Sequence, residues 1–278
     1  MSDTRPLLAI DGDSFAHRAY HALPSSIRRA DGRPGNMVVG WTNMVLRLWE
    51  AERPRAVFVA WDSIGHPTYR HEAFAGYQGG RDFPVDLMEQ LEFLPAATEA
   101  LGFAYAKAAG YEADDFLAAA AVHADGSVLV ACGDRDAFQL ASERVQVLFP
   151  VRGVSELARI GPGEVRDRYG VEPHQVPDFI ALRGDPSDKL PGAPGVGPKK
   201  AADVLRQYGT LEAALADGRF APHAEELRLY RRIAQLDASA PLPPLQDQTP
   251  RWAEASLFYR ENGFNRLAER LEELARTS

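Results

Sequence analysis

Several aspartates stand directly after short apolar segments that have the length and composition of buried β-strands. These segments and acids are Leu7–Ile10 with Asp11, Ala56–Trp61 with Asp62, and Val128–Ala131 with Asp134 and Asp136. In an open parallel sheet, ligands bind beyond the carboxyl ends of the strands, so these acids should meet at one edge. A single such acid is explained equally well as a polar residue where the chain leaves the core. Several carboxylates together repel one another unless protons or cations neutralise them, which favours a metal pocket.

Two further groups of acids lie outside these segments. Glu112, Asp114 and Asp115 begin a predicted helix, and Asp185 and Asp188 lie in a predicted turn. Each group has an ordinary structural explanation, because acids in a first helical turn favour the helix dipole and aspartates are common in turns. Together with the strand-end acids they form a set of nine oxygen donors, which suits Mg²⁺ or Mn²⁺ better than Zn²⁺. One ion cannot use so many ligands, so we predict two ions, roughly 3.5–4 Å apart, that act on a phosphodiester.

A glycine- and lysine-rich segment over residues 190–200 predicts a phosphate-binding hairpin. Its central residues are Gly195, Val196, Gly197, Pro198, Lys199 and Lys200. The two glycines allow backbone N–H groups to approach a phosphate, and a helix that starts at the proline would direct its positive end toward the anion. The two lysines stand in a first helical turn, where the dipole disfavours cations, so they indicate an anionic partner. The alternative is a glycine-rich turn with solvated lysines.

The composition is that of a globular protein without a membrane span. Of the 278 residues, 45% are apolar and 25% are charged. No apolar run approaches the roughly 18–20 residues of a membrane helix, and the first run is too short for a secretory signal, so we predict a cytoplasmic protein. The net charge of −8 argues against DNA binding, but it becomes +1 when the nine clustered acids are set aside. The single cysteine, Cys132, stands in an apolar segment, and we interpret it as a core residue rather than a nucleophile.

The order of the predicted elements indicates an α/β core followed by a helical module. The predicted strands are 7–10, 56–61, 103–107, 128–131 and 145–149, and the helices between them are 36–50, 85–101 and 112–123. Strands that alternate with helices imply a parallel sheet with right-handed crossovers. After Pro150 we predict no further strand. Helices should begin instead at Pro162, Pro173, Pro198 and Thr210.

These patterns divide the chain into three parts. We predict an α/β core over residues 1–150, a helical module over 151–240, and a C-terminal segment over 241–278 that packs back on the core. Within the core, residues 66–84, here called the arch segment, are rich in glycine and aromatic residues and have no clear period. Such a segment predicts a long loop or a mobile helix, and long irregular segments in compact domains are usually functional or disordered.

Taken together, the motifs resemble the structure-specific 5′ nuclease (flap endonuclease) family in order and spacing. The matching segments are Ile10–Gly12, Trp61–Asp62, Tyr111–Asp115, Gly133–Leu140, Gly184–Asp188 and Gly195–Lys199. The likeness extends from Leu7 to about Leu271 and is strongest to the 5′→3′ exonuclease domain joined to bacterial DNA polymerase I. It implies an α/β fold with a twisted, mainly parallel sheet and flanking helices (a PIN-like nuclease core). It also implies a helical arch and a small DNA-binding module of the helix–hairpin–helix type.

The resemblance divides the nine acids between two ions. The first set is Asp11, Asp62, Glu112 and Asp114, the second is Asp134, Asp136, Asp185 and Asp188, and Asp115 lies between them or behind the ligands. Asp11, Asp62 and Asp134 are the candidate catalytic acids. In the family the hairpin binds duplex phosphates, with a K⁺ held by backbone carbonyls, so residues 190–200 are expected to do the same.

The resemblance also gives roles to the arch segment. It implies that Tyr77 stacks on a base near the cut and that Arg70 and Arg81 steer phosphate. Two residues depart from the family. Gln78 stands where an arch lysine is usual, which predicts slower turnover because a cation there would offset transition-state charge. Lys189 stands where asparagine is frequent and could add a contact to DNA phosphate.

The implied substrate is DNA with a free 5′ end, in a flap, a nick or an overhang, cut in replication and repair by a monomeric enzyme without a membrane. A DNA polymerase, fused or separate, is a further expected partner. RNA-containing substrates stay open, because phosphate contacts do not distinguish sugars. The chain is then either a free-standing enzyme or a domain of a longer protein.

Two rival functions were weighed against nuclease activity. A relative that binds branched DNA with little cleavage would be marked by missing acids, and none of the nine is missing. In a haloacid-dehalogenase-type phosphatase, Asp11 would be a covalent nucleophile and Gly184 would follow a strand. Residues 177–183 have a helical pattern instead, and the phosphatase would not explain the hairpin.

Overall fold

A six-stranded sheet forms the centre of the computed structural model, which describes residues 5–79, 83–152 and 156–277. The strands are β1 (Leu7–Asp11), β2 (Ala56–Ala60), β3 (Ala104–Ala106), β4 (Val128–Ala131), β5 (Val145–Arg152) and β6 (Glu156–Ile160). Their order is β3-β2-β1-β4-β5-β6, and every neighbouring pair is parallel except β5 and β6. The predicted parallel sheet is confirmed, and the carboxyl ends of β1, β2 and β4 lie at one edge.

One prediction about the sheet is wrong. We expected no strand after Pro150, yet β5 continues to Arg152 and β6 follows it as an antiparallel edge strand. Within β6 only Ile160 is buried, and Glu156 and Arg159 are exposed. A short edge strand with so little buried surface shows almost no apolar signal in the sequence.

Helices cover both faces of the sheet. One face is covered by α1 (Gly12–Ala22), α2 (Asn36–Glu52) and α4 (Val85–Ala100), and the other by α5 (Ala113–His123). Helices α11 (Trp252–Glu261) and α12 (Asn265–Thr277) pack on the outside of α2 and α4. Successive side chains of a strand point to opposite faces. Leu8 of β1 therefore joins the core cluster of Trp41 in α2, whereas Leu7 joins that of Phe116 in α5.

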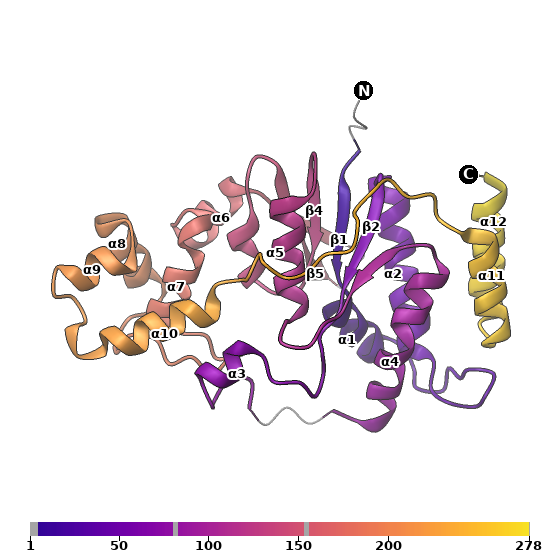
Figure 1. Cartoon of the computed structure of the whole chain (residues 1–278), viewed down its shortest axis with the longest axis horizontal. Helices are drawn as coiled ribbons and strands as arrows, with labels where there is room; N and C mark the ends of the chain where they lie inside the picture. Colours follow the sequence, from indigo (N-terminus) through magenta and orange to yellow (C-terminus); the bar gives the residue numbers. More distant parts are fainter. Residues whose placement is uncertain (1–4, 80–82, 153–155, 278) are drawn as a thin grey trace.

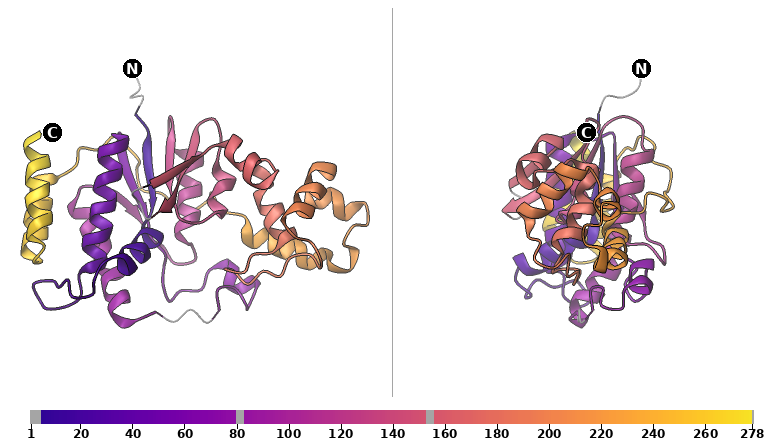
Figure 2. Two further views of the ribbon diagram at one scale, coloured as in Figure 1. Left: turned by 180° about the vertical axis from the view of Figure 1, so that it is seen from behind. Right: turned by 90° about the vertical axis from the view of Figure 1, so that its left-hand side faces the viewer.

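Most of the other helices form a module beside β5 and β6. They are η1 (Asp136–Leu140), α6 (Pro162–Tyr169), η2 (Pro173–Gln175), α7 (Val176–Arg183), α8 (Pro198–Tyr208), α9 (Leu211–Ala216), η3 (Ala221–His223) and α10 (Ala224–Ala234). The predicted starts at Pro162, Pro173 and Pro198 are confirmed, and Thr210 caps α9 by accepting a hydrogen bond from the Ala213 N–H. Helices α7 to α10 lie at one end of the elongated molecule, and α11 and α12 lie at the other (Figures 1 and 2).

The C-terminal helices pack on the core rather than on the helical module. Trp252 and Tyr259 of α11 belong to the same buried cluster as Leu8 and Trp41. The extended chain that leads to them lies against the start of β2, because the Gln248 N–H donates to the Arg55 carbonyl. Across the described ranges, no helix has both the length and the apolar character needed to cross a membrane.

Within its described residues, 66–79 and 83–84, the arch segment contains one short helix, α3 (Tyr69–Ala73). This helix lies against the end of α10, where the Tyr69 hydroxyl donates to the Gln235 carbonyl at 2.9 Å. The arch segment therefore crosses from the end of β2 to the helical module, and it passes the sheet edge at which the acids emerge (Figure 1).

Candidate active site

The carboxyl ends of β1, β2 and β4 place Asp11, Asp62 and Asp134 around one cavity of about 880 Å³. Glu112 and Asp114, at the start of α5, line the same cavity. The sheet and the helix thus bring together residues from four separate places in the sequence. We call these five acids, together with Asp136, Asp185 and Asp188, the acid pool.

The local structure fixes the direction of each strand-end acid. Asp11 caps α1, because its Oδ1 accepts a hydrogen bond from the Ser14 N–H at 2.8 Å. Asp62 Oδ1 accepts from the Ala113 N–H at 2.7 Å, which ties β2 to the start of α5. The turn after β1 requires Gly12, because a Cβ there would lie 2.5 Å from the Trp61 ring. These contacts fix one oxygen of each carboxylate at the edge of the cavity that both residues line.

Electrostatic repulsion within the first part of the acid pool is strong. Burial, and then the charges of Asp62 and Asp134, raise the pKa of Asp11 to about 7. Burial and the charges of Asp11, Asp134 and Asp62 raise the pKa of Asp114 well above its ordinary value. A cation that enters the cavity would relieve this repulsion, so the site fits a bound metal.

The second part of the acid pool lies beside Asp134. Burial, and then Asp134, Asp188 and Asp185, raise the pKa of Asp136. Burial, Asp134 and Asp185 raise the pKa of Asp188 to about 6. Asp134 raises the pKa of both Asp114 and Asp188, so it stands between the two sets of acids that the resemblance implies.

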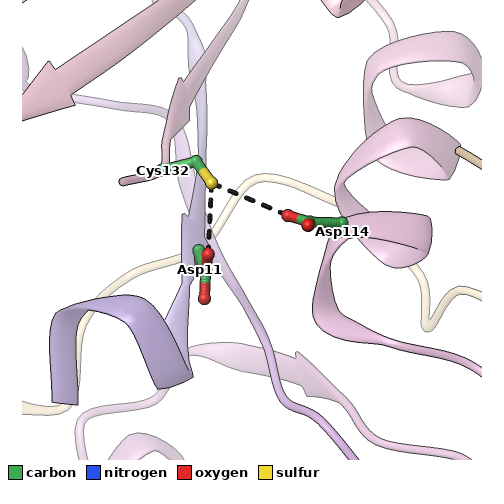
Figure 3. Close-up of side chains that lie close together, drawn as sticks. All are labelled: Asp11, Asp114 and Cys132. Atoms are coloured by element: carbon green, nitrogen blue, oxygen red, sulfur yellow. Dashed lines mark hydrogen bonds between the residues drawn. The ribbon is translucent and has the colours of Figure 1, made fainter. Parts of the chain in front are cut away.

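Two residues of the site were missed in the sequence. Asp13 also lines the cavity, and its Oδ2 accepts a hydrogen bond from the Asp62 N–H at 2.7 Å. Cys132 is buried, as predicted, but its Sγ donates to Asp11 Oδ2 at 3.1 Å and lies 3.6 Å from Asp114 Oδ1 (Figure 3). The signal for both was available, because each stands within two residues of a strand-end acid.

Asp115 does not share the position of the other acids. Its side chain is fully buried, and both oxygens accept hydrogen bonds from Arg70, at 2.9 and 2.7 Å. The Asp237 N–H also donates to it, at 2.9 Å. The sequence counted Asp115 among the oxygen donors, but these donors use its lone pairs, so it lies behind the ligands, which is one of the two positions that the resemblance allows.

The arch residues also lie differently from the family expectation. Arg70 is only 2% exposed and cannot reach a phosphate in this structure. Tyr77 is 4% exposed, and its hydroxyl donates to Glu112 Oε2 at 2.9 Å, so its ring is packed inward rather than presented to a base. Thr68 donates to the other oxygen of Glu112, also at 2.9 Å. Arg81 lies outside the described residues.

Gln78 and Lys189, the two departures from the family, each form a hydrogen bond to a sequence neighbour of the other. The Gln78 amide donates to the Tyr77 hydroxyl at 2.9 Å and to Asp188 Oδ1 at 3.4 Å. Lys189 Nζ donates to the carbonyl of Gly79. Together these contacts join the arch segment to the turn that carries Asp185 and Asp188. They explain why polar residues suit both positions.

The predicted hairpin connects α7 to α8 and has two kinds of glycine. Gly184 and Gly192 pack against each other, because a Cβ on Gly192 would lie 2.4 Å from the Gly184 nitrogen. Gly195 and Gly197 instead face open space, with nothing within 4 Å of a Cβ at either position. Lys199 and Lys200 are exposed, and Lys200 Nζ donates to the Gly195 carbonyl at 3.4 Å. The backbone beside α8 is thus accessible to an anion.

Comparison with known protein families covers almost the whole chain. Residues 6–170 match the family described as 5′-3′ exonuclease, N-terminal resolvase-like domain, and residues 171–255 match the 5′-3′ exonuclease, C-terminal SAM fold. DNA polymerase I of Mycobacterium leprae is 44% identical over 215 residues, which is 75% of this chain and 24% of that protein. The chain thus spans about a quarter of that relative. A 5′-3′ exonuclease of Streptomyces coelicolor is 34% identical over 85% of this chain and 87% of its own length.

A solved structure shows the same fold. The flap endonuclease D15 of bacteriophage T5, crystallised with DNA and metal ions, superposes with a TM-score of 0.69 at 18% identity, over 98% of this chain and 100% of that one. The resolvase-like domain carries the strand-end acids and the helical SAM-type domain carries the hairpin. On its sequence, its fold and the arrangement of both domains, this chain belongs to the 5′-3′ exonuclease family.

Proposed function

We propose that the chain is a divalent-metal-dependent 5′ nuclease that hydrolyses phosphodiesters near free 5′ ends in flapped, nicked or overhanging DNA. The observation that carries this proposal is the acid pool, whose members repel one another and five of which line the cavity of about 880 Å³. The hairpin lies in the neighbouring helical module, where its exposed lysines and open backbone would bind phosphates of the duplex. Family membership agrees with this activity, which we assign to replication and repair.

Mg²⁺ or Mn²⁺ would suit the site best. All members of the acid pool are oxygen donors, and the pKa of the Cys132 thiol is raised by burial and by Asp11, so the sulfur stays protonated. Two such ions would polarise the phosphodiester, promote attack by water and offset charge on the leaving oxygen. Asp11, Asp62, Glu112 and Asp114 would hold one ion, and Asp134, Asp136, Asp185 and Asp188 the other.

The chain's own residues would bind and orient the DNA. Gly195, Val196 and Gly197 would offer backbone to a duplex phosphate, and Lys199 and Lys200 would add charge. The carbonyls of residues 190–200 would hold a K⁺, which would take the place of the Lys200 ammonium at the Gly195 carbonyl. Tyr77 and Arg81 of the arch segment would contact the 5′ end after Tyr77 leaves Glu112.

We further propose that the enzyme acts as a monomer in the cytoplasm, beside or joined to a DNA polymerase. The similarity to DNA polymerase I relatives supports the polymerase link. The phosphatase alternative fails, because α7 (Val176–Arg183) is a helix where that fold needs a strand. The non-cutting relative is not favoured either, because all members of the acid pool are present.

Cleavage of end-labelled substrates tests the proposal. Flapped, nicked, overhanging and blunt duplexes, with and without an RNA segment at the 5′ end, would be incubated with Mg²⁺, with Mn²⁺ or with excess EDTA. We expect short products from the 5′ end of flapped or nicked DNA with either metal and none with EDTA. Undiminished cleavage in EDTA would exclude the metal mechanism, and tight binding without cleavage would identify a branched-DNA-binding relative.

A further inference from the structure

Arg70 has a different position from that of a phosphate-contacting residue, and its surroundings indicate another role. We propose that Arg70 is a positioning residue. It clamps the arch segment and the end of α10 to the start of α5, and so fixes Glu112 in the acid pool. This inference rests on the proposed nuclease function, in which Glu112 is a metal ligand.

Three segments that are distant in the sequence meet at the Arg70 guanidinium. Within α5, Asp115 accepts both terminal nitrogens, at 2.9 and 2.7 Å, in the bidentate geometry that suits arginine. From the end of α10, the Ile233 carbonyl accepts from Nε at 3.0 Å. Arg70 itself belongs to α3 in the arch segment. One side chain therefore holds the arch segment, the metal-binding helix and the helical module together.

Asp115 connects Arg70 to the backbone of two other segments. It accepts the Asp237 N–H at 2.9 Å and the Glu112 N–H at 3.2 Å. Arg70 also lies 3.5 Å from Glu112 Oε2, so the guanidinium attracts the side chain whose backbone Asp115 holds. The buried ion pair therefore holds the Glu112 backbone through Asp115 and attracts its carboxylate, which Thr68 and Tyr77 also bond.

The geometry leaves no room for a phosphate at Arg70. The side chain is 2% exposed, and its charge faces the fully buried Asp115. Breaking such a pair would leave a buried, uncompensated charge, so the pair should persist when DNA binds. The positive charge of Arg70 therefore serves Asp115 and Glu112 and not the substrate.

Four variants and a matched control separate the two roles. Arg70→Lys keeps the charge but cannot bond to both Asp115 oxygens and the Ile233 carbonyl at once. We expect it to lower kcat on a flap substrate by about a hundredfold, as misplacement of a catalytic group can do, with KM changed less than about threefold. Arg70→Gln and Asp115→Asn should be similarly slow, and the Arg70→Gln/Asp115→Asn double variant little slower than either. The control is Arg260→Lys, in the exposed ion pair with Glu272 that joins α11 to α12.

Amide hydrogen exchange gives a readout without metal or substrate. Asp115 accepts hydrogen bonds from the Glu112 and Asp237 amides, so these amides should exchange at least about tenfold faster in Arg70→Lys and Asp115→Asn. Their exchange rates should be unchanged in Arg260→Lys. If Arg70→Lys does not fold, the exchange rates of Asp115→Asn test the clamp, because this substitution preserves the side-chain volume and one carbonyl oxygen.

Opposite results would overturn the clamp. Near-normal kcat in Arg70→Gln, with a raised KM and a salt slope of binding flatter by about 0.9, would make Arg70 a phosphate contact. Unchanged exchange at the Glu112 and Asp237 amides in the folded variants would also reject it. If the wild-type protein cuts no substrate, the proposed function fails, while the exchange experiment still tests the clamp.

Discussion

In the proposed function, the acid pool and the hairpin both contact the phosphate backbone of DNA. They differ in the burial of their charged side chains. In the acid pool, like charges are buried together, and the pKa of Asp11 rises to about 7. In the hairpin, Lys199 and Lys200 are exposed and adjoin open backbone at Gly195 and Gly197. A buried, strained cluster can act strongly on charge that develops in a transition state, whereas exposed lysines are screened and contribute mainly affinity.

Asp134→Asn tests the acid-pool side of this comparison and should have the largest effect. Asp134 lies between the two sets of acids, so loss of its charge should weaken both proposed ion sites. We expect the single-turnover rate of flap cleavage to fall by about a thousandfold or more, equivalent to roughly 4 kcal/mol. DNA affinity, measured by fluorescence anisotropy, should stay within about threefold. Asp247→Asn, at an exposed aspartate, is the control, and a loss of less than about tenfold for Asp134→Asn would show that the site is misplaced.

The raised pKa values predict that protons and metal ions compete for the acid pool. Those of Asp11 and Asp188 are raised to about 7 and about 6, so Mn²⁺ affinity should increase as pH rises through this range and level off above it. One displaced proton gives about a tenfold change per pH unit. Calorimetric titration at several pH values measures the slope. A Mn²⁺ affinity independent of pH would contradict the buried, mutually repelling cluster.

The same groups set the stability of the metal-free protein. Because their pKa values are higher in the folded state than in the unfolded state, they stabilise the fold at low pH, and this contribution is lost as pH rises through about 6 and about 7. With EDTA, the Tm should therefore fall as pH rises from about 4 to about 7 and should lose nothing further from these groups above that range. Mn²⁺ should restore it. In Asp11→Asn, the loss should be smaller, and an equal loss would assign it to other groups.

The combined change Lys199→Ala and Lys200→Ala tests the hairpin side. We expect duplex affinity to fall by about tenfold and the slope of log affinity against log salt to flatten by roughly 0.9 for each lost phosphate contact. Sequence preference should not change, because phosphate contacts carry no base information. The maximal single-turnover rate at saturating enzyme should stay close to that of the wild type. An unchanged salt slope would mean that these lysines only face solvent.

Gln78→Lys should have the smallest effect. It tests the contact between the arch segment and Asp188 of the acid pool. A cation in the arch segment could offset charge at the scissile phosphate, but Asp188, which already accepts a hydrogen bond from Gln78, would attract it in the free enzyme. We therefore expect the single-turnover rate to rise only about threefold, or roughly 0.6 kcal/mol. Equal or lower rates would show that another residue already supplies the positive charge.

The sequence predicted the residues whose position follows from regular structure. Asp11, Asp62 and Asp134 end parallel strands, and the topology of a parallel sheet places such residues at one edge. The hairpin could be predicted from the sequence because its glycines, proline and lysines are contiguous. Strand β6 was missed because it buries little.

The directions of the arch side chains could not be predicted from the sequence. The partner of Arg70 lies 45 residues away, and the segment has no period from which an inward direction could be derived. The resemblance therefore placed Arg70 and Tyr77 toward substrate, whereas tertiary contacts with Asp115 and Glu112 hold them inside.

Anomalous diffraction from crystals soaked in Mn²⁺ tests the central claim most directly, because it locates ions without assuming activity. We predict two peaks in the cavity, each with carboxylate oxygens of the acid pool at about 2.1 Å. One should touch Asp11, Glu112 or Asp114, and the other Asp134, Asp185 or Asp188. Asp115 should touch neither ion and should remain bound to Arg70. Absence of any peak at the acid pool, at Mn²⁺ concentrations that support cleavage, would contradict the account.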